Sequence, residues 1–456
     1  MESILQKNQE VLITIRNLGI NGEGIGYYKR QAVFVTGVFP PEEVVVRITD
    51  VKPNHAVAEV VRIKKKAFYR VKPFCPHFGM CGGCQIQHIA YDEQLRLKED
   101  MLKQTFARYT ALDVELLDFK SYPAEQTTRG YRHKAQMPVR NIKTGVVTGL
   151  YKLNSRELVD IRDCPVHDAR INRVNKAVLT LCETHDIRAF DSKTMRGLLR
   201  TIVTRVSRAT GEIQVTLVVT IYNHALQRLA DDLLNEADVV SVAISKLHDA
   251  SSPQMFGETY EVLAGKPVII EAIGQVRFAL NPKAFFQLNP ETATTLYKKV
   301  KQLLTARGAK TVADLYCGAG AVALSLADTC DKVIGIDASK DSIASAKQNA
   351  TLNETSNVHF EMGDAYTTLK ALYDKGETFD ACVFDPPRTG LDRNMIDLLN
   401  RRPVNTLVYI SCNPSTLAKN IHALSRKYDV VSVMPFDMFP HTSHVESVTL
   451  LSLKTP

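Results

Sequence analysis

Short runs of alternating apolar and polar residues, or of β-branched residues, cluster near the start of the chain. They are Val11–Ile15, Ala32–Val35, Val44–Ile48 and Ala56–Ile63. Glycines and the pair Pro40–Pro41 separate these runs, and both residue types favour tight turns. Four or five short strands joined in this way are typical of a small barrel. We therefore expect residues 1–66 to form an N-terminal β-barrel.

A helix is predicted next, over Tyr91–Arg108. Its apolar positions are Leu95, Leu97, Met101, Leu102 and Phe106. From Tyr122 to about Gly265, helical and strand patterns mix, and the clearest strands are Ile202–Val206 and Ile213–Ile221. We expect residues 67–268 to form a central α/β domain.

From about Lys310 onward, apolar strand candidates alternate with helical segments. The candidates are Thr311–Leu315, Val333–Ile336, Val358–Glu361, Ala381–Phe384 and Thr406–Ile410. Strands that alternate with helices form βαβ units, which build a doubly wound parallel sheet. The sequence thus predicts a Rossmann-like α/β domain over residues 269–456.

Charge and hydropathy add limits on partner and location. Lys and Arg number 57 against 49 Asp and Glu, a net charge of +8 that is compatible with a polyanionic partner. No apolar run reaches the roughly 20 residues that span a bilayer. The first ten residues are polar and lack the apolar segment of a secretion signal. We expect a cytoplasmic protein that does not enter the membrane.

Glycines and carboxylates stand at the ends of the predicted C-terminal strands. Gly318 and Gly320 follow the first strand, where the missing side chain lets the backbone approach a ligand. Asp337, Asp364 and Asp385 follow the second, third and fourth strands, and these ends share one edge of the sheet. This set fits S-adenosylmethionine better than NAD. The alternative is that Asp337 and Asp364 only cap helices.

A cysteine follows the fifth strand, in Ser411-Cys412-Asn413-Pro414. Methylation at nitrogen or oxygen needs no thiol, but methylation at C5 of a pyrimidine does. A thiolate that adds to C6 makes C5 nucleophilic, and a base then removes the C5 proton. The segment Pro440 to Glu446 contains imidazole and carboxylate candidates for that base. An inert buried thiol is the alternative for Cys412.

Two further groups of residues carry possible chemistry. Cys75, Cys81 and Cys84 have the spacing C-x5-C-x2-C, and Cys164 precedes a proline as iron–sulfur ligands often do. Four thiolates can bind zinc or a [4Fe–4S] cluster, and the spacing alone does not choose. The basic strip Arg129 to Lys134 could contact RNA through its cations and aromatic rings, or it could be an ordinary basic strand.

Several of these motifs together resemble the bacterial RNA uridine-C5 methyltransferases, specifically the branch that acts on 23S ribosomal RNA. The resemblance covers nearly the whole chain. It rests on Phe285-Phe286-Gln287-Leu288-Asn289, Asp314 to Gly320, Asp385-Pro386-Pro387-Arg388, Ser411 to Pro414, and His441 to Glu446. One departure is Asp337, where some members have Glu; an aspartate should still bind ribose.

The resemblance implies a role for most of these residues. It makes Cys412 the nucleophile and Glu446 the base that removes the C5 proton. The implied S-adenosylmethionine contacts are Gln287, Tyr316, Asp337 and Asp385, and Asp385 could also hold the uracil edge. Phe285 would stack near the flipped target base.

The resemblance also implies partners and cofactors. The barrel looks like a TRAM domain, which members that act on transfer RNA usually lack. The four cysteines would bind a [4Fe–4S] cluster, and Arg132 and Lys134 would lie in an RNA-contacting segment. The helix over about residues 91–108 would pack on the catalytic domain. We expect a monomer whose partner is 23S ribosomal RNA.

Four alternatives differ in substrate or in class. The same chemistry on a transfer RNA uridine is one. An RNA cytosine-C5 methyltransferase typically has a second cysteine after a proline on strand four, where this chain has Asp385-Pro386-Pro387. An amino-group methyltransferase with D/N-P-P-Y would have an aromatic residue in place of Arg388. A non-catalytic RNA-binding or redox-sensing protein would not need Cys412 and Glu446 together.

Overall fold

The barrel predicted at the N-terminus forms as a closed five-stranded β-barrel. The computed structural model describes residues 4–125, 127–143, 145–191, 193–247 and 254–455, so the first three residues of the polar N-terminal segment lie outside it. The barrel strands run in the order β1-β2-β3-β5-β4. They are β1 (Glu10–Leu18), β2 (Gly24–Tyr28), β3 (Gln31–Val35), β4 (Glu43–Val51) and β5 (His55–Lys65). Alternate side chains of β1 are buried, as the period of a strand requires.

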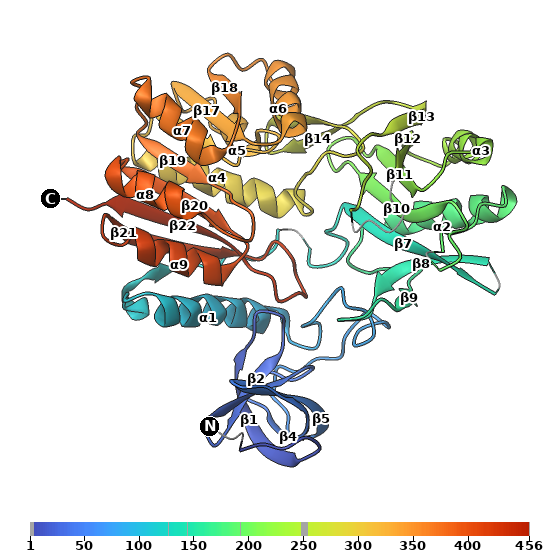
Figure 1. Cartoon of the computed structure of the whole chain (residues 1–456), viewed down its shortest axis with the longest axis horizontal. Helices are drawn as coiled ribbons and strands as arrows, with labels where there is room; N and C mark the ends of the chain where they lie inside the picture. The colour runs from blue at the N-terminus through green and yellow to red at the C-terminus, as the bar shows by residue number, and fades with distance from the viewer. Residues whose placement is uncertain (1–3, 126, 144, 192, 248–253, 456) are drawn as a thin grey trace.

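The central domain is built on a seven-stranded sheet of order β13-β12-β11-β10-β7-β8-β9. Helices α2 (Ala169–Thr184) and α3 (His224–Leu233) pack on it. The strands are β7 (Lys134–Ile142), β8 (Gly145–Tyr151), β9 (Leu158–Asp160), β10 (Leu199–Val206), β11 (Ile213–Val219), β12 (Val239–Lys246) and β13 (Glu261–Gly265). In Figure 1 this domain lies beside the C-terminal domain, and the barrel lies below both.

The C-terminal domain is the predicted Rossmann-like fold, with an eight-stranded sheet of order β18-β17-β16-β19-β20-β22-β21-β6. Its parallel strands are β16 (Thr311–Leu315), β17 (Lys332–Asp337), β18 (Val358–Met362), β19 (Ala381–Phe384) and β20 (Thr406–Ser411). β22 (Glu446–Leu453) pairs antiparallel with β20 and with β21 (Tyr428–Phe436). The five strands predicted from alternating strand and helix patterns are therefore confirmed.

Helices cover both faces of this sheet, as doubly wound folds require. Val312 and Val333 point to one face, whereas their chain neighbours Ala313 and Ile334 point to the other. The helices are α4 (Pro290–Ala306), α5 (Ala321–Ser325), α6 (Lys340–Leu352), α7 (Ala365–Asp374), α8 (Arg393–Arg401) and α9 (Pro414–Leu424), and a hairpin of β14 (Ile269–Ile273) and β15 (Val276–Leu280) precedes them. Among the described residues, no helix is both long enough and apolar enough to span a membrane.

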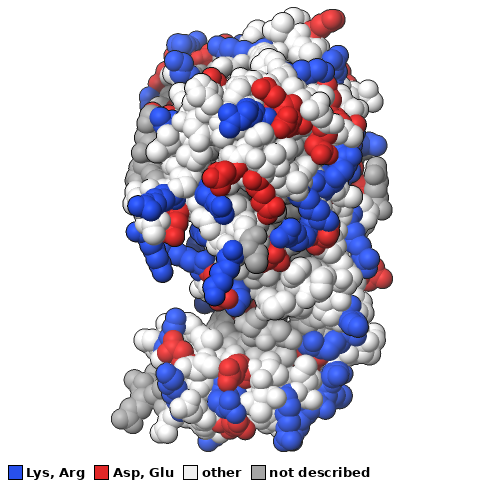
Figure 2. Space-filling model, turned by 90° about the vertical axis from the view of Figure 1, so that its right-hand side faces the viewer, with Lys and Arg blue, Asp and Glu red and all other residues white. Residues whose placement is uncertain are grey.

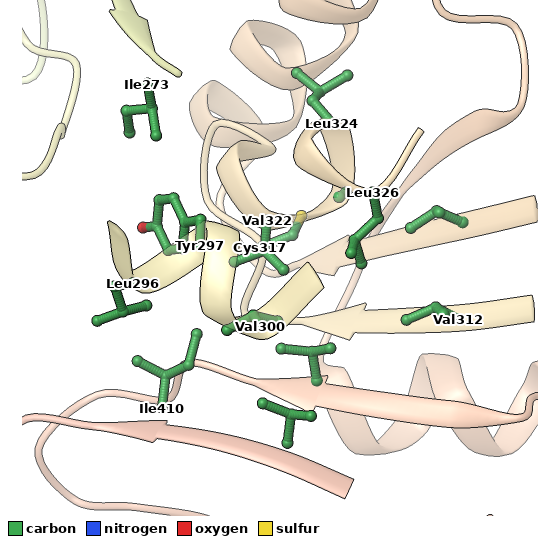
Figure 3. Close-up of a cluster of buried hydrophobic side chains, with 14 of the residues drawn as sticks. Ile273, Leu296, Tyr297, Val300, Val312, Cys317, Val322, Leu324, Leu326 and Ile410 are labelled. Atoms are coloured by element: carbon green, nitrogen blue, oxygen red, sulfur yellow. The ribbon is translucent and has the colours of Figure 1, made fainter. Parts of the chain in front are cut away.

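Helix α4 fixes the position of the loop that follows β16. Leu296, Tyr297 and Val300 of α4 pack in one hydrophobic cluster with Val312 of β16. Cys317, Val322 and Leu326, from the loop and helix after β16, join the same cluster, as Figure 3 shows. The glycine turn between Cys317 and Val322 is thus held at both ends by buried side chains.

One segment from before the central domain packs into the C-terminal domain. Helix α1 (Tyr91–Tyr109) buries Leu102 and Phe106 in the cluster that covers one face of the C-terminal sheet, and it lies along α9. After the short helix η1 (Val114–Leu116), strand β6 (Asp118–Phe119) adds the last strand of that sheet beside β21. In Figure 1, α1 runs below α9 at the edge of this domain.

We expect Phe106→Ala to lower the free energy of unfolding of the C-terminal domain by about 3–5 kcal/mol, because Phe106 is fully buried in its core. Denaturant unfolding followed by circular dichroism measures this loss. Leu116→Ala is the control; its side chain is 83% exposed, so a change within about 0.5 kcal/mol is expected. Equal stability of Phe106→Ala and the wild type would mean that α1 is not part of this core.

Candidate active site

The predicted site residues of the C-terminal domain meet at the carboxyl edge of its sheet. Tyr316 to Gly320 follow β16, Asp337 ends β17, Asp364 follows β18, Asp385 follows β19 and Cys412 follows β20. These five strands are parallel neighbours, so their carboxyl ends lie along one edge. Ligands bind at this edge in open α/β sheets.

The turn after β16 adopts backbone conformations that favour glycine. Tyr316, Gly318 and Gly320 have φ values of 65°, 54° and 87°. A Cβ built on Gly320 would lie 2.6 Å from the ring of Phe360, so packing fixes this position. A Cβ built on Gly318 would meet nothing within 4 Å, so this part of the turn borders open space that a ligand can enter.

Asp337 ties the glycine turn to the start of α6. Its Oδ2 accepts a hydrogen bond from the backbone N–H of Gly318 at 3.0 Å, and its Oδ1 accepts one from Ser339 at 2.8 Å. Each carboxylate oxygen has a second lone pair that can accept from a ribose hydroxyl. Asp364 caps α7 by accepting from the N–H of Thr367 at 3.0 Å, so a capping role explains one of its oxygens.

A further buried acid, Asp314, lies in β16 just before this turn. No separate role was predicted for it from the sequence. Asp314 is fully buried, and burial, with the charges of Asp385 and Asp337, raises its pKa well above the usual value. Its Oδ2 accepts from the N–H of Ala323 at 2.9 Å. Its Oδ1 has no hydrogen-bond partner in the described part of the chain. An unpaired buried carboxylate oxygen calls for a cationic or hydrogen-bonding ligand.

Gln287 lies next to these acids. Its Nε2 donates to the hydroxyl of Tyr297 at 3.1 Å. Burial raises the pKa of Tyr297, and the charges of Asp385, Asp314 and Glu446 raise it further, so the phenol lies among these carboxylates. Phe285, two residues earlier, is 74% exposed, whereas Phe286 is buried in the core.

Cys412 and Glu446 flank the last residue pair of two paired strands. The antiparallel register of β20 and β22 runs from Thr406 opposite Ser452 to Ser411 opposite Ser447. The next residues on the two strands are Cys412 and Glu446. Cys412 also directly precedes Asn413, the N-cap of α9, where the helix dipole favours a thiolate.

The ionisable groups around Cys412 perturb one another. Burial and the Glu446 carboxylate raise the pKa of Cys412, whereas the Arg388 guanidinium lowers it. Burial and the Asp385 charge raise the pKa of Glu446 well above its usual value. Burial also raises the pKa of Asp385 to about 7. Arg388 is therefore the cation of this group. From the sequence it was noted only as the residue that stands where an amino-group methyltransferase would have an aromatic side chain.

The two histidines of the segment before Glu446 differ in placement. His441 is buried, and burial lowers its pKa to about 4; its Nδ1 lies 3.2 Å from Nε2 of Gln94 in α1. His444 is exposed to solvent as a residue. Its imidazole is still partly covered, and this partial burial together with the charge of Arg388 lowers its pKa. Of the imidazole and carboxylate candidates, Glu446 is the group whose charge acts on the thiol.

The two residues predicted to contact RNA in the basic strip lie away from the open surface. Lys134 is 6% exposed, and burial together with Arg205 lowers its pKa to about 6. Arg132 is half-buried and lines the cavity described next. Exposed basic residues are found on the barrel instead, at Arg62, Lys64 and Lys65. Figure 2 shows basic side chains on the barrel and on the larger body, on either side of a narrow waist.

The four predicted metal-ligating cysteines line one cavity. Cys75, Cys81, Cys84 and Cys164 come together there with Arg132, and no Asp or Glu is among the lining residues that the structure describes. Burial raises the pKa of Cys84 to about 12, and the charges of the other three thiols act in the same direction. Within the described ranges, no three His, Cys, Asp or Glu groups are arranged to hold a single metal ion.

Comparisons with known proteins agree with the sequence motifs. The tRNA (uracil-5-)-methyltransferase family matches residues 90–454, and the TRAM domain matches residues 5–61. An uncharacterized RNA methyltransferase of Bacillus anthracis is 39% identical over 456 residues, which cover 99% of both chains. One from Halalkalibacterium halodurans is 38% identical over 451 residues, 98% of this chain and 97% of the relative.

A solved structure resembles nearly the whole chain. It is the tRNA (uracil-54, C5)-methyltransferase of Pyrococcus abyssi in complex with S-adenosyl-L-homocysteine. The TM-score is 0.76 at 27% identity, and the match covers 97% of this chain and 100% of that one.

We expect the pH at which Cys412 is half alkylated to depend on its charged neighbours. Arg388→Gln removes the cation that lowers the pKa of the thiol, so the midpoint moves to higher pH. Glu446→Gln removes an anion that raises it, so the midpoint moves to lower pH. Iodoacetamide labelling of the Cys412 peptide, read by mass spectrometry, measures both. The Cys330 peptide of the same digests is the internal control, and shifts of equal sign in the two variants would contradict this charge arrangement.

Proposed function

The chain belongs to the tRNA (uracil-5-)-methyltransferase family of S-adenosylmethionine-dependent RNA methyltransferases, and we propose that it methylates C5 of a uridine in 23S ribosomal RNA. The observation that carries the chemistry is the register of β20 and β22, whose last pair, Ser411 and Ser447, adjoins Cys412 and Glu446, together with the effect of the Glu446 charge on the pKa of Cys412. A thiol close to a buried carboxylate at the carboxyl edge of the sheet suits nucleophilic addition followed by proton removal.

The carboxyl edge fits a cationic cofactor. S-adenosylmethionine has a sulfonium and an ammonium group, and it supplies an electrophilic methyl group when bound. Asp314, Asp337 and Asp385 supply carboxyl oxygens at this edge, and Oδ1 of Asp314 has no hydrogen-bond partner in the described part of the chain. Burial raises the pKa of Asp314 and Asp385, and a bound cation would favour their ionised form. Such a site disfavours the pyrophosphate of NAD, which is anionic. We assign Asp337 to the ribose and Asp314 to the ammonium, with Gln287, Tyr316, Gly318, Gly320 and Asp364 lining the rest of the site.

In the proposed reaction Cys412 acts first. Its thiolate, stabilised by Arg388 and the N-terminus of α9, adds to C6 of the uracil. Addition breaks the C5–C6 double bond and leaves an enolate, whose electron pair at C5 would take the methyl group that the bound cofactor supplies, with the electrons of the broken methyl–sulfur bond staying on sulfur. Glu446 accepts the C5 proton, the C5–C6 double bond re-forms, and the bond from C6 to Sγ breaks.

The burial of Glu446 suits it to this last step. A carboxylate with an ordinary pKa is a weak base, whereas burial and Asp385 raise the pKa of Glu446 well above that value. A base works best when its pKa is near the working pH. Burial raises the pKa of Asp385 to about 7, and we propose that this residue holds the uracil edge. Phe285 is exposed and available to stack on a base that leaves the RNA helix.

The choice of ribosomal over transfer RNA rests on the resemblance to the branch that has a TRAM barrel and a cysteine cluster. One observation favours transfer RNA as the second candidate. The Pyrococcus abyssi enzyme is named for a transfer RNA uridine, and its match covers 97% of this chain. We propose further that the protein acts in the cytoplasm as a monomer, with the exposed cations of β5 among its RNA contacts.

We also propose that Cys75, Cys81, Cys84 and Cys164 bind a [4Fe–4S] cluster. The donor set supports this, because four thiols line one cavity that also holds a guanidinium, which offsets the charge of thiolate ligands. Four thiolates also suit zinc, and the choice of the cluster rests on the family resemblance.

The test of the activity is release of tritium from 5-tritiated uridine in unmodified 23S ribosomal RNA. We expect release by the wild type in the presence of S-adenosylmethionine, and a fall of at least about three orders of magnitude in Cys412→Ala. Glu446→Gln should slow release by about 10²–10⁴-fold, the contribution of a general base. Cys330→Ser, a thiol outside the site, is the control. Release from transfer RNA alone would favour the second candidate, and release from neither RNA would refute the proposal.

For the cluster, we expect the anaerobically purified protein to contain iron and sulfide in equal amounts, about four of each per chain by the formula of the cluster. Cys84→Ser should lose most of the iron. Cys182→Ser, a buried thiol of the same domain outside the cavity, should keep it. Elemental analysis and sulfide determination measure these contents. Stoichiometric zinc without iron or sulfide would overturn this assignment.

A further inference from the structure

We propose that His441 is a positioning residue through which helix α1 and the loop of residues 73–87, here called the cysteine loop, hold Glu446 close to Cys412. The inference deepens the proposed function and rests on it, since it assumes that Glu446 removes the C5 proton. The loop that joins β21 to β22, residues 437–445, leads directly into Glu446. Loops between strands usually lie on the surface. Here Asp437, Met438, His441 and Ser443 are each less than a tenth exposed.

The backbone of His441 is bonded from two distant parts of the chain. Its carbonyl accepts from the N–H groups of Gln85 and Ile86, both at 3.1 Å. Its N–H donates to Oε1 of Gln94 in α1, also at 3.1 Å. Gln85 directly follows Cys84, so a proposed cluster ligand and the base-bearing loop are separated by one peptide bond and one hydrogen bond.

The side chain of His441 completes the contact with α1. Nε2 of Gln94 lies 3.2 Å from Nδ1 of His441 and also donates to the carbonyl of Ile89 at 2.8 Å. An amide donor to Nδ1 requires the neutral imidazole, which agrees with a pKa lowered to about 4 by burial. The ring of Phe74, from the start of the cysteine loop, meets the imidazole edge-on at 4.9 Å between ring centroids.

The backbone conformation shows that these contacts impose the shape of the loop. His441 has a φ of 68°, in the left-handed region that residues other than glycine seldom occupy. Such a conformation persists where the surroundings over-determine it. Four hydrogen bonds and a ring contact do so here.

Other contacts hold the loop of residues 437–445 on either side of His441. Lys98, one turn after Gln94 in α1, forms a buried ion pair with Asp437 at 2.6 Å and donates to the carbonyl of Phe439 at 3.2 Å. Ser443 Oγ donates to the carbonyl of Ile20 in the barrel at 2.9 Å. The barrel, the cysteine loop and α1 therefore all converge on the residues before Glu446. Of these contacts, only those of His441 join α1 and the cysteine loop through one residue.

The experiment follows the step that needs Glu446. If the contact between His441 and Gln94 is lost, we expect that Cys412 still adds to the uracil and that C5 is still methylated. Removal of the C5 proton by Glu446 should then become slower. We expect His441→Ala, Gln94→Ala and Glu446→Gln all to accumulate a covalent, methylated RNA–protein complex during turnover. The kcat of His441→Ala and Gln94→Ala should fall about tenfold with KM for RNA and for S-adenosylmethionine changed less than twofold. Denaturing gels with methyl-tritiated cofactor measure the complex.

Two variants separate positioning from general damage. His441→Asn keeps a side-chain acceptor and a residue type that tolerates the left-handed region, so it should restore release. His422→Ala, an exposed histidine of α9, should behave as the wild type. Iron content and thermal unfolding are measured on each variant. If His441→Ala does not fold, Gln94→Ala carries the test, because it removes the same contact from the α1 side.

The outcomes distinguish this inference from the proposed function. Wild-type protein that forms no Cys412 adduct with RNA containing 5-fluorouridine would refute the function itself. Suppose instead that the wild type forms this adduct and turns over normal RNA. If folded His441→Ala and Gln94→Ala then release product at the wild-type rate, only the inference is overturned. Folded variants that lose activity without accumulating the complex would overturn it as well.

Discussion

The pairing of β20 with β22 is the constraint on which the rest of the site depends. Backbone hydrogen bonds between antiparallel strands fix which residues face each other, and a slip of one residue would turn every side chain to the opposite face. The register ends with Ser411 opposite Ser447, so Cys412 and Glu446 are brought together by the sheet rather than by a flexible loop. Three further segments hold the chain just before Glu446. Strand pairing and these contacts thus both act on the position of the proposed nucleophile and base.

Electrostatics at the carboxyl edge divide the site in two. Asp314, Asp337 and Asp385 make one side strongly acidic, which suits a cofactor that is itself cationic. Around Cys412 the Arg388 guanidinium opposes the nearby carboxylates, although burial and Glu446 still leave the pKa of the thiol above its usual value. Asp385 belongs to both parts, because its charge acts on Asp314 and on Glu446. In the proposed reaction Asp385 would therefore act both on the cofactor side of the site and on the basicity of Glu446.

Features that depend on local sequence were predictable. The barrel strands and the five parallel strands follow from the spacing of apolar residues, and the strand-end motifs located the carboxyl edge. Features that depend on distant neighbours were not. Lys134 reads as a cation for RNA, yet its cross-strand neighbour Arg205 and the segment near Ala284 bury it. From the sequence, Asp364 could either bind the cofactor or cap a helix. In the structure one of its carboxylate oxygens caps α7.

The same limit applied to the segment before Glu446. From the residues alone, an imidazole and a carboxylate were both candidates for the base, and the family resemblance pointed to Glu446. The contacts of the His441 ring with Gln94 and Phe74, more than three hundred residues earlier, show that this imidazole packs inside the fold. The role of Arg388 was also hidden, because its effect depends on a thiol that lies on the next strand of the sheet.

The placement of α1 and β6 has a consequence for how the protein is made. Both complete the C-terminal sheet domain, but the ribosome produces them before the whole central domain. Leu102 and Phe106 emerge long before the strands and helices that bury them, and contacts of such large sequence separation form slowly. During synthesis this apolar face must stay exposed or be covered by something else. The C-terminal sheet domain is thus discontinuous in the gene. A fragment that begins after the central domain would lack α1 and β6, and the apolar residues that Leu102 and Phe106 cover would be open to solvent.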